Sequence, residues 1–205
     1  MHKEILSKNQ VELLTLVKHF IREYYLVGGT AIALHIGHRQ YIDFDLFKYG
    51  PLKHLSNVNK ISSFNYPYII TRKVTEQMNV TIKDVKVTFY QYPFKIDAQC
   101  KFDDILRLPE LKDLAAMKAY ALGRRSKWKD YVDLYFLIKY YYSIEQISAR
   151  AIEIYDQLFS EKLFRAQLSY FDDINYSEPI EYLSTPVPED EIRNFLIDKA
   201  IDIGL

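Results

Sequence analysis

Two aspartates separated by one residue stand in the segment YIDFDLF, at positions 43 and 45. Side chains of a β-strand alternate between its faces, so Asp43 and Asp45 are expected on one face and their apolar neighbours on the other. Adjacent carboxylates repel each other unless a cation lies between them, and Mg²⁺ or Mn²⁺ prefers such oxygen ligands. The pair therefore predicts a metal site, with two solvated aspartates on a half-exposed strand as the alternative. The neighbours expected in the core are Ile42, Phe44 and Leu46.

A glycine pair precedes the aspartates by one predicted helix. Gly28 and Gly29 follow the short apolar strand predicted for YYLV, and Thr30 opens TAIALHI, a predicted helix that ends at Gly37. Glycine lets the backbone approach a ligand closely, and the first N–H groups of a helix bind phosphate. The Thr30 hydroxyl adds a donor, whereas a tight strand–helix turn is the simpler interpretation of the glycines alone. A phosphate-binding turn, then a helix, then a strand that carries two carboxylates follow one another in the sequence. This order favours an enzyme that binds a nucleoside triphosphate with metal ions.

The segment GGTAIALHIGHRQYIDFDLF resembles the first motif of the polymerase β-like nucleotidyltransferase superfamily, in the form found in the AbiEii/AbiGii toxin family. Two later segments, LKDLAAMKAYALGRRSKWKDYVDLYFL and SYFDDINYSEPIEYL, are similar to the later helical motif and the C-terminal segment of that family. The resemblance implies phosphate-binding glycines, metal-binding aspartates, and a lysine and an aspartate that complete the site. These residues are, in the same order, Gly28 and Gly29, Asp43 and Asp45, and Lys118 and Asp130.

The sequence departs from the superfamily at a third carboxylate. Polymerase β-like enzymes usually add an acid from a later strand, which binds metal and takes the proton of the attacking hydroxyl. The strand predicted for VKVTFYQY places Thr88 and Tyr90 on one face and offers no acid there. Asp97 is the nearest substitute and a candidate metal ligand, whereas Asp84 is expected only in a turn. The departure leaves the general base unassigned.

Lys118 can be interpreted without the family. Leucines and alanines at helical spacing surround it, so it belongs to the buried face of its predicted helix. A lysine there must reach the surface or meet an anion, and a triphosphate is one such anion. On the next helix Asp130 and Asp133 share a face, where either can orient Lys118. Asp130 alternatively interacts with the helix N-terminus, and Asp133 alternatively pairs with Arg124 or Arg125.

Three further features have two interpretations each. Arg39 either anchors the turn before the aspartate strand or contacts phosphate. The one basic cluster either receives a nucleic-acid backbone or forms a solvated turn. The tyrosine run at residues 140–142 either stacks bases or packs between helices, and packing is the commoner role. The members of the basic cluster are Arg124, Arg125, Lys127 and Lys129.

The composition is that of a soluble globular protein, with 49% apolar and 26% charged residues among 205. Basic and acidic residues number 27 each, so no overall charge draws the chain to nucleic acid or membrane. A single cysteine, Cys100, excludes an intrachain disulfide and favours a reducing compartment. The polar N-terminus lacks the apolar core of a signal peptide, and no apolar run reaches the roughly 18 residues of a membrane span. We expect a cytoplasmic protein.

The predicted elements give an α+β fold. A polymerase β-like domain with a mixed or antiparallel sheet and flanking helices is expected over residues 1–107, and a helical bundle that completes the active site over residues 108–205. In the first part, the predictions are a capped helix over 8–22, a helix begun by Pro51 and an antiparallel meander over 68–92. In the second part, helices are predicted for 109–122, 128–141, 143–159 and 189–203, with a Pro-rich connector over 171–190.

We therefore expect an Mg²⁺-dependent enzyme that transfers a nucleoside monophosphate from a nucleoside triphosphate to an acceptor hydroxyl and releases pyrophosphate. The resemblance implies a toxin of a toxin–antitoxin or phage-defence pair, with tRNA as the acceptor and a cognate antitoxin as the partner. A small hydroxylated molecule or a protein side chain is the alternative acceptor. Because the third acid is missing, a nucleotide-binding module with little turnover is the alternative from another class.

Overall fold

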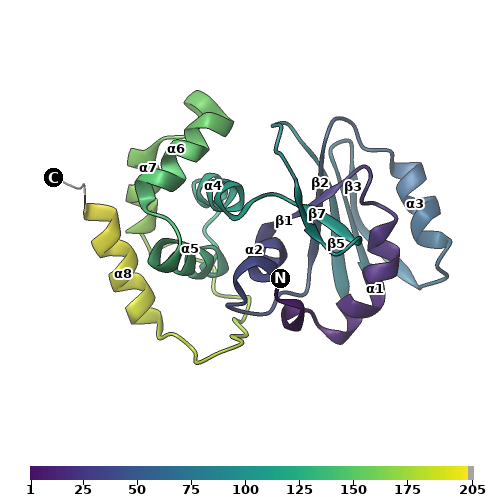
Figure 1. Ribbon diagram of the computed structural model, residues 1–205, viewed down its shortest axis with the longest axis horizontal. Helices are drawn as coiled ribbons and strands as arrows, with labels where there is room; N and C mark the ends of the chain where they lie inside the picture. Colours follow the sequence, from purple (N-terminus) through teal and green to yellow (C-terminus); the bar gives the residue numbers. More distant parts are fainter. Residues whose placement is uncertain (203–205) are drawn as a thin grey trace. The chain divides into compact units, whose positions relative to one another are not determined.

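A computed structural model describes residues 1–202 of the chain (Figure 1). The backbone forms two compact units, Met1–Glu110 and Leu111–Leu205. The glycine and aspartate segments belong to the first unit, and Lys118 belongs to the second. Within residues 1–202, no helix is long and apolar enough to cross a membrane.

The first unit is built on a five-stranded mixed sheet with the strand order β1-β2-β5-β4-β3. β2 and β5 run parallel, and the other neighbouring strands are antiparallel. The predicted α+β class and the meander are confirmed, with Lys83 and Asp84 in the turn between β4 and β5 at φ values of 50° and 63°. The strands are β1 (Tyr25–Val27), β2 (Phe44–Tyr49), β3 (Tyr68–Val74), β4 (Gln77–Ile82) and β5 (Val85–Tyr92).

One face of this sheet packs against two helices and forms the core of the unit (Figure 1). Phe89 of β5 is fully buried there, with its ring centroid 4.8 Å from that of Phe20 and 5.3 Å from that of Tyr24. Asn57 donates a hydrogen bond of 2.8 Å to the Tyr24 hydroxyl. The opposite face carries the alternate residues of the strands, among them Asp45. The two helices are α1 (Lys8–Lys18) and α3 (His54–Ser62).

Capping residues set the helix boundaries of the first unit. Ser7 and Gln10 form the predicted capping box of α1, but the helix ends at Lys18, because residues 19–23 form turns. Helix α2 (Gly28–Ile36) begins two residues earlier than predicted and ends at Gly37, whose φ is 65°. Pro51 does not begin α3, which starts at His54, so this prediction is wrong.

Three short elements of the first unit were not predicted. β6 and β7 form an antiparallel hairpin, and the 3-10 helix η1 lies near the N-terminus. Strands of three residues are too short to show the alternation that identifies a strand. The hairpin belongs to the first unit, which extends to Glu110. These elements are η1 (Lys3–Ile5), β6 (Cys100–Phe102) and β7 (Leu106–Leu108).

The second unit is helical, as predicted. Ser143 caps α6 through a capping box with Gln146. Helix α7 was not predicted, because only Phe164 and Leu168 of its eight residues are buried and its periodicity is weak. The predicted end of the last helix, residue 203, lies outside the described residues. The elements are α4 (Leu111–Leu122), α5 (Trp128–Tyr140), α6 (Ile144–Tyr155), η2 (Asp156–Leu158), α7 (Glu161–Leu168) and α8 (Glu189–Ile201).

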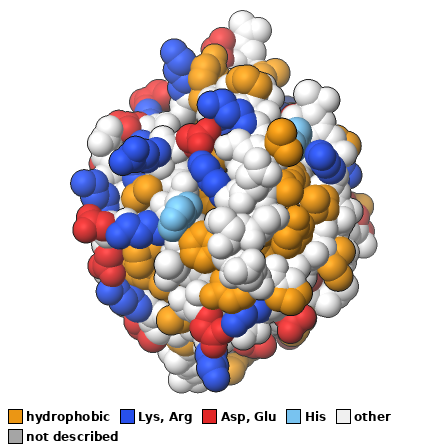
Figure 2. Space-filling view, turned by 90° about the vertical axis from the view of Figure 1, so that its right-hand side faces the viewer, with side chains coloured by type: hydrophobic (Ala, Val, Ile, Leu, Met, Phe, Trp, Pro, Cys, Tyr) orange, Lys and Arg blue, Asp and Glu red, His pale blue; other side chains and the backbone are white. Residues whose placement is uncertain are grey.

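The outer face of the first unit, on the side of α1 and α3, mixes charged and hydrophobic side chains (Figure 2). Exposed apolar side chains are ordinary on soluble proteins and indicate no function by themselves. None of the residues that the sequence nominates for a site belongs to α1, α3 or β3. The large apolar residues exposed in these three elements are Val11, Leu55, Ile69, Ile70 and Val74.

Candidate active site

The aspartate pair lies at the start of β2. Asp45 is the second residue of the strand, and Asp43 directly precedes its first residue, Phe44; both aspartates are half-buried. Phe44 and Leu46 are fully buried, as predicted, but Ile42 is 54% exposed, so its predicted place in the core is wrong. The alternation of side chains does not reach Ile42, because the strand begins only at Phe44.

Gly28 brings the start of α2 into contact with Asp45. Its φ of 72° lies in the left-handed region that glycine adopts readily. A Cβ atom on Gly28 would lie only 2.5 Å from Asp45 Oδ2. Val27, directly before Gly28, is the cross-strand partner of Asp45. The strand register and the lack of a side chain on Gly28 together place this carboxylate at the N-terminus of a helix.

Thr30 connects α2 to the other aspartate. Its hydroxyl donates a hydrogen bond to the backbone carbonyl of Asp43, and the side chain is buried. The sequence suggests this hydroxyl as a phosphate donor, whereas the structure uses it to hold the chain just before β2. The first turn of α2 therefore contacts both aspartate positions, through Gly28 and through Thr30.

Gly29 makes room for a tyrosine. A Cβ atom on Gly29 would lie 1.7 Å from the ring of Tyr41. The Arg39 guanidinium lies 3.6 Å from the centroid of the same ring and donates to the Tyr41 hydroxyl. Arg39 is fully buried. This stacking favours the anchoring role of Arg39 over phosphate contact, and it gives Tyr41 a structural role that the sequence did not indicate.

Thr88 lies on β5, the strand from which a third carboxylate is expected. It is the partner of Asp45 across the parallel pair of β2 and β5, and it is buried. Asp97 is exposed in a loop, where it accepts a hydrogen bond of 2.8 Å from Gln99. Among residues 1–202, no group of three or more His, Cys, Asp and Glu side chains is placed to hold a metal ion. The structure therefore does not bring Asp97 together with Asp43 and Asp45.

Two carboxylates suit Mg²⁺, because this ion is commonly held by one or two carboxylates while substrate phosphates and water fill its other positions. Asp45 forms no ion pair within the described part of the chain. Beside it, Gly28 has no side chain, so the Asp45 carboxylate approaches the backbone at the start of α2 closely. No described side chain caps α2 at Val27, so its first N–H groups suit an anion. The residues present fit a phosphate group that carries a divalent cation.

In the second unit, Lys118 of α4 is buried against two aspartates of α5. Its Nζ lies 2.7 Å from Asp130 Oδ1 and 2.8 Å from Asp133 Oδ2. Arg125 donates two hydrogen bonds to Asp130, of 2.9 and 3.2 Å. Lys118 thus meets an anion, as its buried position predicts, but the chain itself supplies that anion. Asp133 forms an ion pair with Lys118, the cation that the sequence suggests it can orient.

Opposite charges set the protonation of this cluster. Burial alone would lower the pKa of Lys118, but the nearby Asp130 and Asp133 carboxylates outweigh it and raise that pKa. Burial would likewise raise the pKa of Asp130, but Lys118 and Arg125 hold that pKa below its ordinary value. The cluster is a charge-balanced network that joins α4 to α5.

A model of the family described as "Nucleotidyl transferase AbiEii toxin, Type IV TA system" matches residues 15–203, nearly the whole chain. The chain belongs to this family. Membership confirms the resemblance of the sequence motifs, and the AbiEii-family protein is a nucleotidyltransferase of a toxin–antitoxin family.

Three further proteins are similar to this chain in sequence or in structure. The uncharacterized protein aq_aa25 of Aquifex aeolicus is 31% identical over 143 residues, which cover 65% of this chain and 68% of the relative. JHP933 from Helicobacter pylori has a TM-score of 0.55 at 19% identity, over 95% of this chain and 91% of that one. The nucleotidyltransferase toxin MenT4 from Mycobacterium tuberculosis H37Rv has a TM-score of 0.59 at 13% identity, over 93% of this chain and 81% of that one. At these identities the structural matches show a shared fold.

Three of the four residues in the basic cluster of the AbiEii-family protein form ion pairs with carboxylates. The Nζ atoms of Lys127 and Lys129 lie 2.6 and 3.1 Å from oxygens of Glu178. Arg125 belongs to the ion-pair network of α4 and α5, and Arg124 stacks at 3.4 Å over an aromatic ring. These contacts favour the interpretation as a solvated turn over that of a track for a nucleic-acid backbone.

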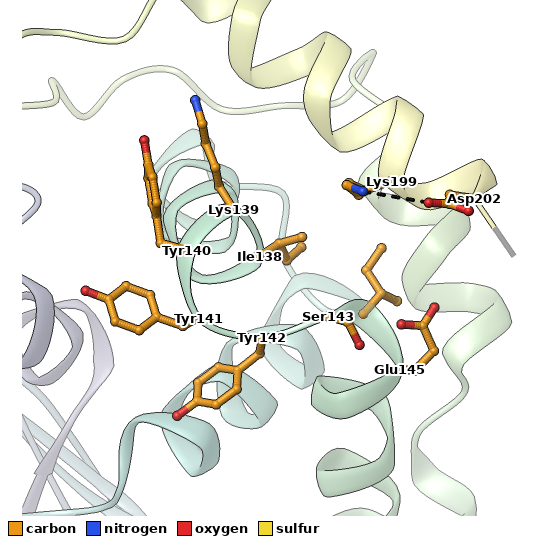
Figure 3. A pocket seen from close by; sticks show the side chains of 10 residues that line it. Ile138, Lys139, Tyr140, Tyr141, Tyr142, Ser143, Glu145, Lys199 and Asp202 are labelled. Atoms are coloured by element: carbon orange, nitrogen blue, oxygen red, sulfur yellow. Dashed lines mark ion pairs between the residues drawn. The ribbon is translucent and has the colours of Figure 1, made fainter. Parts of the chain in front are cut away.

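The tyrosine run of the AbiEii-family protein lines a pocket of about 340 Å³ (Figure 3). The side chains of Tyr140, Tyr141 and Tyr142 point in different directions from the end of α5 (Figure 3). Tyr140 and Tyr141 are exposed, so the prediction that they pack between helices is wrong. The reason is that α5 ends at Tyr140 and the chain turns there. Apart from the tyrosine run itself, the pocket is lined by none of the candidate site residues of the sequence.

Replacing Gly28 by alanine is expected to displace the Asp45 carboxylate and to lower nucleotide transfer on the order of 100-fold, the effect of a misplacement of about 1 Å. Gly50→Ala is the matched control, because Gly50 also has a positive φ, 93°, but a Cβ atom there would meet no other atom within 4 Å. Both variants should lose about 1 kcal/mol of unfolding free energy through the backbone. Transfer rates and denaturant unfolding of both variants test this, and equal losses of transfer would contradict it.

Acid is expected to weaken the second unit through Asp130. Its pKa in the folded state lies below the ordinary value of 3.8, so its stabilising contribution is complete above that value and is lost as the pH falls through the folded value. Asp130→Asn should cost about 3–5 kcal/mol at neutral pH, because it breaks a buried network. The variant should then lose less further stability on acidification than the natural chain. Parallel curves of thermal unfolding midpoint against pH would contradict this account.

Proposed function

We propose that this AbiEii-family protein is a Mg²⁺-dependent enzyme that transfers a nucleoside monophosphate from a nucleoside triphosphate to an acceptor hydroxyl. The contact between Gly28 and Asp45 is the observation that carries the proposal. The N-terminus of a helix attracts negative charge, and a carboxylate attracts positive charge. A ligand that suits both at once is a phosphate group with a bound divalent cation.

Different residues of the first unit would bind the cation and the phosphates in this reaction. Asp43 and Asp45 would hold the cation, and the N–H groups of Gly28 and Gly29 would bind the outer phosphates. Mg²⁺ supplies neutralisation of the charge on the triphosphate and on the departing pyrophosphate. The acceptor oxygen attacks the α-phosphorus, the bond from this phosphorus to the bridging oxygen breaks, and pyrophosphate leaves. The acceptor hydroxyl gives up its proton to water. Thr30 keeps the helix and the strand in register for this step through its bond to the Asp43 carbonyl.

The proposed acceptor is tRNA, and the proposed partner is a cognate antitoxin. The support for both is the family, which is described as a toxin of a type IV toxin–antitoxin system. A cytoplasmic location belongs to the same proposal, because nucleoside triphosphates and tRNA are found there. The antibiotic-resistance factor ANT(2'')-Ia shares the fold, with a TM-score of 0.52 at 12% identity over 70% of this chain and 90% of that one. A small hydroxylated molecule is therefore the alternative acceptor, and the labelling experiment must distinguish it from tRNA.

Labelled nucleotide is expected to be transferred to tRNA when the protein is incubated with each α-labelled nucleoside triphosphate, Mg²⁺, total tRNA and a cell extract. Asp43→Asn and Asp45→Asn should lower the labelling by about 100- to 1,000-fold, because each removes charge that stabilises the transition state. Both variants should remain folded, since the two side chains are half-buried and lie outside the core. Label in a protein or small-molecule fraction would replace tRNA as the acceptor. Undiminished labelling by both variants would remove the aspartates from the site.

The catalytic roles that the family resemblance implies for Lys118 and Asp130 remain predictions. Lys118→Ala should weaken binding of the nucleoside triphosphate by roughly tenfold, the loss of one charge-assisted hydrogen bond. Asp133→Asn is the control, because it disturbs the same buried cluster at a residue without an implied role. Titration calorimetry on folded protein measures both variants. Equal nucleotide affinities would make the role of Lys118 structural.

A further inference from the structure

Three lysines surround one carboxylate on the side of the sheet that α1 and α3 cover (Figure 1). The Nζ atom of Lys60 lies 2.8 Å from Glu23 Oε1 and donates to it. This hydrogen bond holds the pKa of Glu23 below its ordinary value. The Nζ atoms of Lys48 and Lys53 each lie 3.8 Å from the other oxygen, Oε2. We call these four residues the lysine cluster; its three ammonium groups and one carboxylate leave an excess of two positive charges.

Helix α3 holds two of these lysines in place. Lys53 directly precedes the helix and Lys60 belongs to its last turn, so the two lie on one face, with Asn57 between them. Asn57 is buried and donates a hydrogen bond of 2.8 Å to the Tyr24 hydroxyl. This bond ties the face of α3 to the residue that follows Glu23. The fold of the first unit therefore brings the positive charges together.

Lys48 is the member of the cluster that most needs a further anion. Its side chain is only 12% exposed, and its distance of 3.8 Å from Glu23 is too long for a hydrogen bond. The ring of Tyr24, with its centroid 5.5 Å from Nζ, is its other contact. Within residues 1–202, the Lys48 ammonium group donates no hydrogen bond. Because burying an ammonium group without hydrogen bonds is costly, its three donors suit a ligand with several acceptor oxygens.

The N-terminus of α3 adds to the positive charge of the cluster. Lys53 is the N-cap residue, no described side chain caps the helix there, and its first turn contains no acidic residue. The first N–H groups of a helix attract negative charge, so a cation at this end is unfavourable by itself. A bound anion would relieve this repulsion.

The rings beside the cluster leave no surface on which a base could stack. Phe20 and Tyr24 lie under Lys60 and Lys48, and they are 1% and 0% exposed. The cluster can therefore recognise the charge of a ligand but not a ring. A terminal phosphate group carries about two negative charges at pH 7, whereas each phosphate of a nucleic-acid backbone carries one. The excess of two positive charges matches the terminal phosphate.

We propose that the lysine cluster binds a terminal phosphate group, either that of inorganic pyrophosphate or that of a small phosphorylated molecule. Lys48 donates its unused hydrogen bonds to the phosphate oxygens, and Lys53 and Lys60 share their charge between the phosphate and Glu23. Side chains alternate along β2, so Lys48 lies on the core side of the sheet and Asp45 on the opposite face. The site is therefore separate from the candidate active site, and the inference does not rest on the proposed function.

The test is titration calorimetry of the full chain with inorganic pyrophosphate, at low salt and in buffer freed of divalent cations. Lys48→Met and Lys60→Met should each weaken binding by about 10- to 100-fold, the loss of one charge-assisted hydrogen bond. Lys53→Met should weaken it by about 2- to 5-fold, because this side chain is 68% exposed and its charge is screened by water. The exposed position also keeps the Lys53 variant folded if either of the other two unfolds.

Two controls assign the binding to the cluster. Lys73→Met should bind pyrophosphate like the natural chain, because Lys73 is an exposed lysine of the same unit that forms no ion pair within the described residues. Without a divalent cation, the carboxylates of Asp43 and Asp45 repel pyrophosphate, so the candidate active site contributes little to the titration. A nucleoside 5′-monophosphate is titrated as the second ligand, to distinguish a phosphorylated small molecule from inorganic pyrophosphate.

Weaker binding in the three cluster variants, with Lys73→Met unchanged, supports the site, whether or not the protein transfers nucleotides. No binding of either ligand to the natural chain overturns the inference, and so does affinity that the cluster variants leave unchanged. A loss in Lys73→Met as large as that in Lys48→Met also overturns it, because the attraction would then be diffuse. Displacement of pyrophosphate by single-stranded RNA without terminal phosphates would overturn it in favour of a nucleic-acid backbone.

Discussion

The close approach of Gly28 to Asp45 is the constraint on which the candidate site depends. Antiparallel pairing places Val27 opposite Asp45, and the next residue already begins α2. Because a side chain at position 28 would occupy the space of the carboxylate, the helix can start there only with glycine. The result is a negative charge at the positive end of a helix. In the proposed function, a phosphate would be attracted by the same N–H groups and repelled by Asp45, and a cation shared between the two anions would resolve this conflict.

Much of the fold could be predicted because its signals are local. Capping boxes at Ser7 and Ser143 and a left-handed glycine after α2 mark helix ends directly in the sequence. The hairpin of β6 and β7 and the helix α7 carry too few buried residues to show a period. Pro51 gives an ambiguous signal, because proline suits both the first turn of a helix and the loop before it. Only the packing of α3 decides where that helix begins.

For the candidate site, the sequence predicted residue types better than contacts. The glycine pair and the aspartates are recognisable from their spacing, since each depends on one turn or one strand. The contact of Tyr41 with Gly29 depends on the path of the chain between α2 and β2, and that of Thr88 with Asp45 depends on the register of strands far apart in sequence. Neither is visible in local spacing. The burial of Lys118 could be predicted from helical periodicity, but its partners come from another helix.

The two groups of carboxylates differ in how their charge is compensated. Asp130 and Asp133 are buried and share two cations, Lys118 and Arg125, whereas Asp45 is half-buried and forms no ion pair within residues 1–202. A phosphate that drew Lys118 away would break the ion pair between Lys118 and the fully buried Asp133, and breaking a buried pair is strongly unfavourable. Lys118 can therefore serve a nucleotide only while it keeps its aspartates. In the proposed reaction, positive charge at Asp45 would come from outside the chain, with a divalent cation that accompanies the triphosphate.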